Sequence, residues 1–236
     1  MAHEMTEAST ELDQWLKDAG SRVSVLQSEP VRSAAAVQLL GVKPAATIHA
    51  VAIRAAGIVV DGWVRVLGGG SSAVEADMAS WNGLGSKVVF PAVPNLFTVG
   101  FDAAGGVFAL DGGALGGVDR AVHYFAPDTL RWESLEGGYT AWLQWLLNEP
   151  DDVDDFYSSL RWNAWEDEVS KLSFDEAIQG YPPLWTTEGK DPNRVQRRIM
   201  RAADAVAFVF DAARQIEGRD VPGPRGAVPA KWLERA

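Results

Sequence analysis

The sequence has no cysteine among its 236 residues, which excludes disulfide bonds, cysteine-bound zinc and catalysis by a thiol. The three histidines, His3, His49 and His123, are too far apart for the short ligand spacings of a zinc site. The longest apolar run, 205–210, is far shorter than the roughly 20 residues that cross a bilayer. The N-terminal stretch lacks the basic and apolar regions of a secretory signal. We therefore expect a cytoplasmic protein that does not contact a membrane and holds no metal.

Motifs that hold nucleotides or carry out catalysis are missing as well. The chain has no GxxxxGK[ST] phosphate loop and no G-x-S-x-G nucleophile motif. Gly68-x-Gly70-x-x-Ala73 resembles a loose dinucleotide fingerprint, but strands and helices do not alternate around it as that fold requires. The acidic run 151–155 lacks the glycine and the final glutamate of a calcium loop. We predict no cofactor and assign no catalytic residue.

Acidic charge is abundant, and it is concentrated in one part of the chain. The net charge is −11, and the segment 128–191 holds fifteen of the 32 acidic residues against four basic ones. That segment alone therefore carries a charge of −11. An acidic surface argues against direct binding of nucleic acid and suits a basic protein partner.

Hydrophobic periodicity predicts helices at both ends of the chain and strands between them. Helices are expected at 10–18 with Thr10 as N-cap, 30–40, 72–81 with Ser72 and Glu75 as a capping box, 139–147, 151–160, 162–172 and 204–216. Strands are expected at 48–55, 58–60, 63–67, 88–90, 96–101, 107–110, 121–125 and 129–135. The breaks between these strands are short, whereas parallel strands need long crossovers, so antiparallel pairing is predicted.

The expected fold is therefore α+β, with an antiparallel meander sheet of about six strands wrapped by helices. The helix at 139–147 should pack on the sheet formed by 96–135, because the period changes from two to 3.6 at Gly137-Gly138. Residues 1–217 are expected to form a single domain. The Pro/Gly-rich tail 218–236 is expected to be poorly ordered.

Three aromatic motifs lie in the acidic half: APDTLRWE at 126–133, RWNAWEDEV at 161–169 and YPPLWTTEG at 181–189. From them we predict a binding surface made of Trp132, Glu133, Trp162, Trp165, Glu166, Tyr181, Trp185 and Glu188. The five aromatic residues of this set should converge, with at least two partly exposed at a groove. A second interpretation stays open, because Trp162, Trp165, Val169 and Leu172 also have the spacing of a core-facing helix stripe.

These motifs, together with WVRVLGGG at 63–70 and FDAAGGVFALDGGALGG at 101–117, resemble a bacterial family known as domain of unknown function 2625. The resemblance covers roughly 10–215 and implies no catalytic residue. The segment 96–147 also resembles the centre of the SUKH superfamily, with a glycine-rich turn (GGVFALDGG), a strand and the helix GYTAWLQWLL. This second resemblance implies a SUKH-like α+β core, and the chain departs from that pattern by a helical C-terminal extension past Pro150. Many members are immunity proteins that bind and block secreted toxins, often nucleases.

The leading functional prediction is a non-enzymatic protein-binding module, an immunity-like inhibitor that engages a basic partner such as a toxin nuclease. Its contact residues would include the acidic side chains Glu133, Glu136, Glu166, Asp167 and Glu188. The alternative is a carbohydrate-active or carbohydrate-binding protein that uses the same tryptophans and carboxylates. A protein with a small-molecule pocket is a third possibility. The sequence leaves the oligomeric state open.

Overall fold

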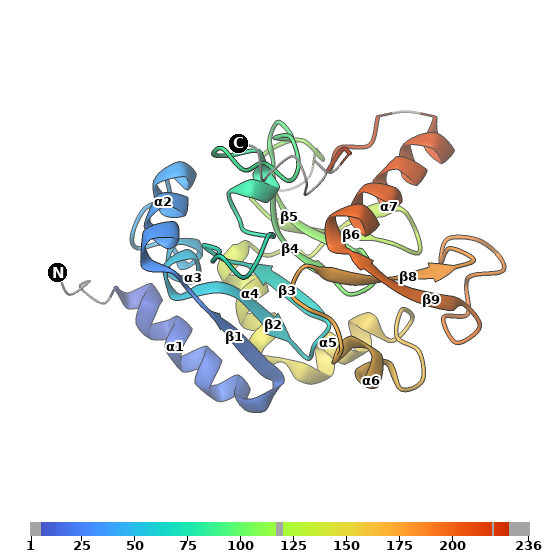
Figure 1. The fold of residues 1–236 in the computed structure, drawn as a ribbon, viewed down its shortest axis with the longest axis horizontal. Helices are drawn as coiled ribbons and strands as arrows, with labels where there is room; N and C mark the ends of the chain where they lie inside the picture. The colour runs from blue at the N-terminus through green and yellow to red at the C-terminus, as the bar shows by residue number, and fades with distance from the viewer. Residues whose placement is uncertain (1–5, 117–119, 219, 227–236) are drawn as a thin grey trace.

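A seven-stranded antiparallel sheet forms the centre of the molecule, and its strands lie side by side in the order of the chain (Figure 1). The computed structural model describes residues 6–116, 120–218 and 220–226. The strands are β1 (Val23–Gln27), β2 (Ala55–Val60), β3 (Val64–Leu67), β4 (Leu96–Asp102), β5 (Val107–Asp111), β6 (Val122–Ala126) and β7 (Arg131–Ser134). The predicted meander is thereby confirmed, with one more strand than expected because β1 was missed.

Four helices cover the first face of this sheet. They are α1 (Glu7–Ala19), α3 (Thr47–Arg54), α4 (Tyr139–Asn148) and α5 (Pro150–Tyr157). Leu12, Val51 and Leu146 are fully buried there, and the ring of Trp142 on α4 lies 5.2 Å from that of Phe108 on β5. The predicted packing of the 139–147 helix on the sheet is therefore confirmed. A further helix, α2 (Pro30–Leu40), packs beside α3.

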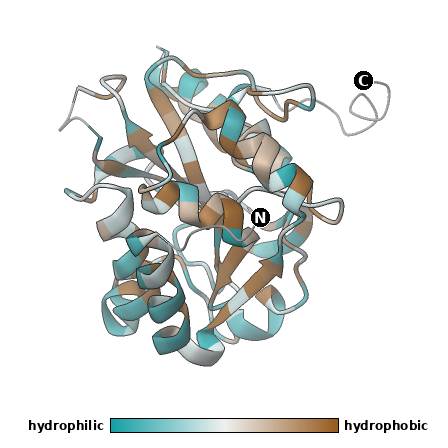
Figure 2. Cartoon of the chain, turned by 90° about the vertical axis from the view of Figure 1, so that its left-hand side faces the viewer, coloured by the Kyte–Doolittle hydropathy of each residue, from teal (hydrophilic) through white to brown (hydrophobic). Residues whose placement is uncertain are grey.

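The second face is covered by the long helix α7 (Ala202–Glu217), by the segment 71–95 and by a separate hairpin, β8 (Glu176–Tyr181) with β9 (Gln196–Arg201). Phe210 of α7 stacks on Phe125 of β6 at 4.1 Å, and Trp81 stacks on Phe101 of β4 at 4.5 Å. Figure 2 shows the result in colour: hydrophobic residues follow the sheet strands, and hydrophilic residues mark the outer sides of the helices. The chain thus has apolar packing on both faces of one sheet.

Helix ends follow the local sequence signals in most places. Pro30 begins α2, and Gly41 ends it in the left-handed conformation at φ 61°, as does Gly218 after α7. The N-cap of α1 is Thr6, whose side chain accepts a hydrogen bond from the Ser9 amide, so the predicted start at Thr10 was one turn too late. Thr10 lies one turn inside the helix, and a threonine there gives the same sequence pattern as a threonine at the N-cap, which explains the error.

The predicted strand 48–55 is wrong, since Thr47–Arg54 form helix α3. Apart from His49 and Arg54 the run is apolar, and a mostly apolar run of about eight residues fits a buried strand and a buried helix equally well. Its alanines favour the helix, and Ala50, Val51 and Ala52 are all buried. The sheet strand begins only at Ala55.

The predicted helix 72–81 is also wrong, because only a short 3₁₀ turn, Ser80–Asn82, forms there. The residues of the expected capping box instead form contacts with residues that are distant in the sequence. The Ser72 amide donates to Glu29 at 2.7 Å, and Glu75 forms an ion pair with Arg201 at 3.0 Å. Asp175 accepts hydrogen bonds from the Glu75 and Ala76 amides. The predicted strand 88–90 is irregular as well.

Two further predicted helices are shorter than expected. Residues 151–160 contribute only to α5, which ends at Tyr157, and 162–172 contribute only α6 (Trp165–Val169). Ala164 precedes α6 in the left-handed conformation at φ 58°, and this separates Trp162 from the helix. The hairpin β8–β9 was not predicted, since QRRIMR has no strand-like alternation of apolar and polar residues.

Part of the predicted tail packs on the domain. Trp132 donates a hydrogen bond to the Pro222 carbonyl at 2.9 Å, and Arg214 donates to the Val221 and Gly223 carbonyls. Residues 220–226 of the predicted tail thus contact the domain, while 219 and 227–236 lie outside the described residues. No helix in the described part of the chain is long and apolar enough to span a membrane.

Asp102 is a fully buried carboxylate that fixes the turn between β4 and β5. Its Oδ1 atom accepts hydrogen bonds from the Ala104 and Gly106 amides at 2.8 and 2.9 Å. Its Oδ2 atom accepts one from the Tyr124 hydroxyl at 2.6 Å. Burial raises the pKa of Asp102, and these hydrogen bonds oppose the rise.

We expect Asp102→Asn to change the pH dependence of stability. A carboxyl whose pKa is raised on folding destabilises the fold progressively as the pH rises from its unfolded value, about 3.9, through its folded value. Asparagine does not ionise. The free energy of unfolding of Asp102→Asn should therefore rise relative to that of the wild type through this pH window, and the difference between the two should stay constant at higher pH. Urea unfolding at a series of pH values measures the difference.

Tyr124→Phe provides the opposite control for Asp102→Asn. It removes a donor that lowers the pKa of Asp102, so it should extend the destabilising window to higher pH. A difference between Asp102→Asn and wild type that stays constant with pH would contradict this account.

Candidate functional site

An aromatic cluster centred on Trp63 joins the sheet to the acidic segment. Trp63 follows β2 and is fully buried. Its ring lies 5.6 Å from Tyr157, 5.5 Å from Trp162 and 5.3 Å from Trp165. The structure therefore brings together two of the predicted binding residues, Trp162 and Trp165, around a tryptophan about 100 residues away in the chain.

Arg161 occupies the space between these rings. Its guanidinium carbon lies 4.0 Å from the ring centre of Trp165, 5.2 Å from that of Tyr157 and 5.3 Å from that of Trp63. Nη1 contacts Asp154 at 2.5 Å, and only 8% of the side chain is exposed. Such contacts between a cation and aromatic faces stabilise partly desolvated arginines. The positive charge of Arg161 is thus covered by aromatic rings and paired with Asp154 inside the protein.

A second arginine ties α6 to the hairpin. Arg197 of β9 lies 4.6 Å from the ring centre of Trp162 and holds Glu168 in a two-point ion pair at 2.9 and 3.0 Å. Glu168 also accepts a hydrogen bond from the indole nitrogen of Trp162 at 3.0 Å. The hydrogen bonds from Arg197 lower the pKa of Glu168. Trp162 is therefore a packed structural residue, 5% exposed.

The other predicted aromatics lie against α7. Trp132 contacts Phe125 and Phe210 at 5.2 and 5.8 Å, and Trp185 contacts Phe208 at 5.4 Å. The five predicted aromatics are thus divided between the Trp63 cluster and α7, and their ring contacts within the described residues do not form one cluster.

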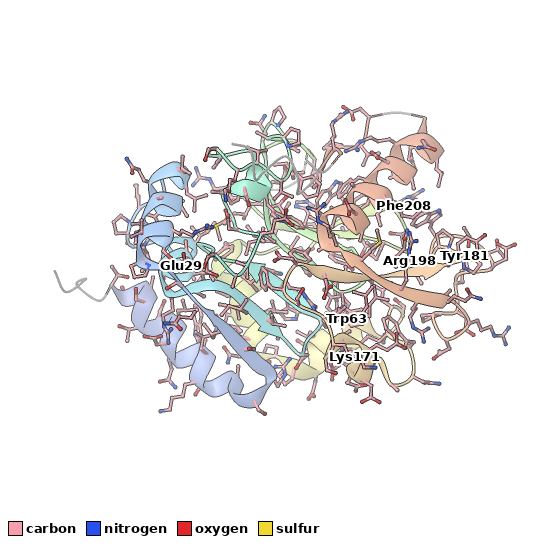
Figure 3. All side chains as sticks on the ribbon, in the orientation of Figure 1. Glu29, Trp63, Lys171, Tyr181, Arg198 and Phe208 are labelled. Carbon is pink, nitrogen blue, oxygen red and sulfur yellow. The ribbon has the colours of Figure 1, made fainter. Side chains whose placement is uncertain are left out.

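Tyr181 is the most exposed of the five predicted aromatics, at 72%. It lines a shallow groove of about 430 Å³ with Arg198 and Phe208. Figure 3 labels Tyr181 and Arg198 on the hairpin and Phe208 on α7, to the right of Trp63 in this view. The predicted acidic residues Glu133 and Glu188 are exposed on separate segments.

Exposed carboxylates gather on the two short helices next to the Trp63 cluster. We call this set the acidic face: Asp151, Asp152, Asp154, Asp155, Glu166 and Asp167. α5 and α6 lie next to each other at the same end of the sheet (Figure 1). The one cation of the linking segment, Arg161, is buried beneath them. Glu166 and Asp167 were predicted from the sequence as contact residues for a partner, whereas 151–155 were not.

A cavity of about 750 Å³ opens beside the acidic face. Its floor is the part of the second sheet face that α7 does not cover, and Ser24, Leu26, Val59 and Arg65 line it. Trp165, Glu166 and the segment 169–174 form its wall. Arg22 and Asp61, which pair at 2.6 Å, stand at its rim. Sequence reasoning missed Arg65 and Arg22, because arginines inside or beside strands give no distinctive pattern.

The described residues contain no group of three or more His, Asp or Glu side chains that could hold a metal ion. The acidic face is therefore a set of separate surface charges. Its chemistry is electrostatic attraction, with Trp165 as the neighbouring aromatic surface.

Comparison with known proteins places the chain among bacterial relatives. Residues 1–205 match the profile of a family described as protein of unknown function DUF2625. The uncharacterized protein YbfG of Escherichia coli (strain K12) is 38% identical over 175 residues, which cover 74% of this chain and 78% of that protein. An uncharacterized protein of Haemophilus influenzae (strain ATCC 51907 / DSM 11121 / KW20 / Rd) is 30% identical over 174 residues, or 73% and 75% of the two chains. No solved structure matches significantly. The family resemblance of the motifs is confirmed, while the SUKH resemblance stays a prediction.

Proposed function

The chain belongs to the DUF2625 family, and from its surface we propose that it is a non-enzymatic protein-binding module that engages a basic protein through the acidic face. The observation that supports this most is the arrangement of α5 and α6. Six exposed carboxylates stand together while the neighbouring cation, Arg161, is enclosed by three aromatic rings. Asp154 is paired with Arg161, but no ion pair with a described residue compensates the other five carboxylates, so a positive partner would meet a net negative surface there.

The expected partner is a basic protein of the size of a single domain, such as a toxin nuclease that the module inhibits. Attraction between opposite charges speeds the encounter of two proteins, and a desolvated aromatic centre then holds the complex. Trp165 lies on α6 itself, is partly exposed and lines the neighbouring cavity, and it would supply that centre. Its second role, covering Arg161, keeps the ring in a fixed position.

The carbohydrate alternative receives less support from the same residues. Sugar rings stack on free aromatic faces, whereas Trp162 is buried and Trp165 already carries Arg161 at 4.0 Å from its ring centre. Trp132 and Trp185 pack against Phe210 and Phe208. Protein binding relies on the charges of the acidic face and needs only the part of Trp165 that is exposed, so we favour it.

Charge reversal on α6 tests the proposal. We expect Glu166→Lys with Asp167→Lys to slow association with the partner about tenfold or more at low salt, because the steering field is reversed. The fold should be retained, since exposed charges contribute little to stability. Affinity capture from extracts of the source bacterium identifies the basic partner, and stopped-flow mixing at several salt concentrations then measures the rate.

A matched control comes from the N-terminal half of α1, where Glu7 and Glu11 are exposed. Glu7→Lys with Glu11→Lys changes the net charge by the same amount but lies at the end of α1 away from α5 and α6 (Figure 1), so it should slow association only slightly. Equal slowing by both pairs would mean that net charge alone matters. An association rate that responds neither to salt nor to the α6 reversal would refute the proposed function.

A further inference from the structure

The cavity beside the acidic face has a character that protein binding does not explain. At about 750 Å³ it falls within the range of small-molecule sites. Much of its lining is apolar, including Leu26, Val59, Leu172 and Phe174. Against this background a charged side chain, Arg65, lies in the floor and is only 1% exposed. A charge buried in an apolar floor needs a reason, because desolvation of an ion is costly.

The hydrogen bonds of Arg65 leave one edge of its guanidinium free. Nη1 donates to the Gly62 carbonyl at 2.6 Å and to the Trp63 carbonyl at 2.9 Å. Nε is buried and has no partner, and no hydrogen bond involves Nη2 in the described part of the chain. The Nε–Nη2 edge presents two parallel N–H groups, which is the geometry that binds a carboxylate at two points.

Arg65 has no directly bonded counter-ion in the described residues. Burial lowers the pKa of its guanidinium to about 10, and the Asp102 and Glu176 carboxylates act against that change from a distance. The side chain therefore remains a cation at neutral pH. An incoming carboxylate would accept hydrogen bonds from Nε and Nη2 of Arg65 and would neutralise its charge. No described residue of the protein accepts those two hydrogen bonds or forms an ion pair with Arg65.

The lining of the cavity also carries negative charge. Three carboxylates line it, and two of them are already paired: Asp61 with Arg22 at 2.6 Å and Asp154 with Arg161 at 2.5 Å. Glu166 is exposed and forms no ion pair with a described residue. The cavity thus offers a buried cation in its floor, an apolar body and a free carboxylate in its wall.

We propose that this cavity binds a small zwitterion, an organic carboxylate that reaches Arg65 and carries an ammonium group toward Glu166 across an aliphatic body. Each part of the ligand follows from one part of the cavity. The carboxylate binds the free guanidinium edge of Arg65, the aliphatic body packs on Leu26 and Val59, and the ammonium group pairs with Glu166. This inference does not rest on the proposed partner binding, although Glu166 belongs both to the cavity and to the acidic face.

Linear ω-amino acids of increasing length are suitable probes, with the corresponding alkanoates and alkylamines as matched controls. Isothermal titration calorimetry on the full chain should show saturable binding of one amino acid length. The alkanoate and the alkylamine of the same length should each bind at least tenfold more weakly, because each lacks one charged group. Arg65→Met should abolish binding of the amino acid and of the alkanoate.

Two further variants keep the test decisive if Arg65→Met fails to fold, since its loss removes the hydrogen bond to the Gly62 carbonyl and one of the two that the Trp63 carbonyl accepts. Arg65→Lys keeps the charge but not the two-point geometry, so affinity should fall about tenfold or more. Glu166→Gln changes an exposed residue and should weaken the amino acid but not the alkanoate. Absence of saturable binding across the series, or affinity indifferent to the Arg65 variants, would overturn the proposal and leave Arg65 as a support for the β2–β3 turn. Equal binding of amino acid and alkanoate would overturn the role of Glu166.

Discussion

Trp63→Ala is expected to lower the free energy of unfolding by about 3–5 kcal/mol, the usual cost of removing a large aromatic from a core. Trp63 is fully buried, and three aromatic rings lie within 5.6 Å of its own. The substitution would also uncover Arg161, whose guanidinium carbon lies 5.3 Å from the Trp63 ring centre. Equilibrium unfolding in urea, followed by circular dichroism, measures the loss.

Two controls separate the cluster from tryptophan burial in general. Trp63→Phe keeps an aromatic ring and loses no hydrogen bond, because the indole nitrogen of Trp63 is buried without a partner. It should cost clearly less than the alanine variant. Trp185→Ala removes a partly exposed ring with one aromatic neighbour and should cost less still. A loss below about 1 kcal/mol for Trp63→Ala would show that the cluster is not a main source of stability.

Gly69→Ala is expected to cost about 1–3 kcal/mol or more, although it adds a single methyl group. A Cβ atom at Gly69 would lie 2.1 Å from the Ala52 carbonyl oxygen of α3 and 3.0 Å from the Ser33 Cα atom of α2. These are backbone atoms of two packed helices and cannot rotate away. Thermal unfolding should show a midpoint lower by several degrees, since each kcal/mol shifts a chain of this size by about 2–4 °C.

Gly138→Ala is the matched control for Gly69→Ala. Its Cβ would come no nearer than 3.6 Å to another atom, the Arg120 carbonyl oxygen, and its φ of −76° suits any residue. Gly138 is the N-cap of α4, where alanine is less favourable than glycine, so the midpoint of Gly138→Ala should fall by about 1–3 °C, less than that of Gly69→Ala. If Gly69→Ala unfolds at the wild-type temperature, close contact between backbones is not the reason for glycine in the WVRVLGGG motif.

Local patterns predicted the sheet well because its strands pair with their sequence neighbours. A meander needs only strand periodicity and short turns, and both are visible in the segment 96–135. The errors occur where distant residues decide the structure. Glu29, Asp175 and Arg201 hold the segment 72–76 and replace the predicted helix. For α3 the reason is different, since a short run of apolar residues fits either period.

The candidate site was predictable only in part. Trp165 and Glu166 were named from the sequence, and both line the cavity. Trp63 and Arg65 belong to the same site but are separated from Trp165 by about 100 residues in the chain. Periodicity carries no information over such a distance, so the Trp63 cluster and the buried arginine could be found only in three dimensions.

The position of α7 at the end of the sheet-forming chain has a consequence for biosynthesis. The strands emerge in pairing order, so the sheet can grow as the chain is made. Phe125 stays without its partner Phe210, however, until about 85 further residues have been added. At roughly 5–20 residues per second this takes about 4–17 s, during which an apolar sheet face is open to solvent. Nascent chains that stall between β7 and α7 should therefore be the form of this protein that aggregates or recruits chaperones.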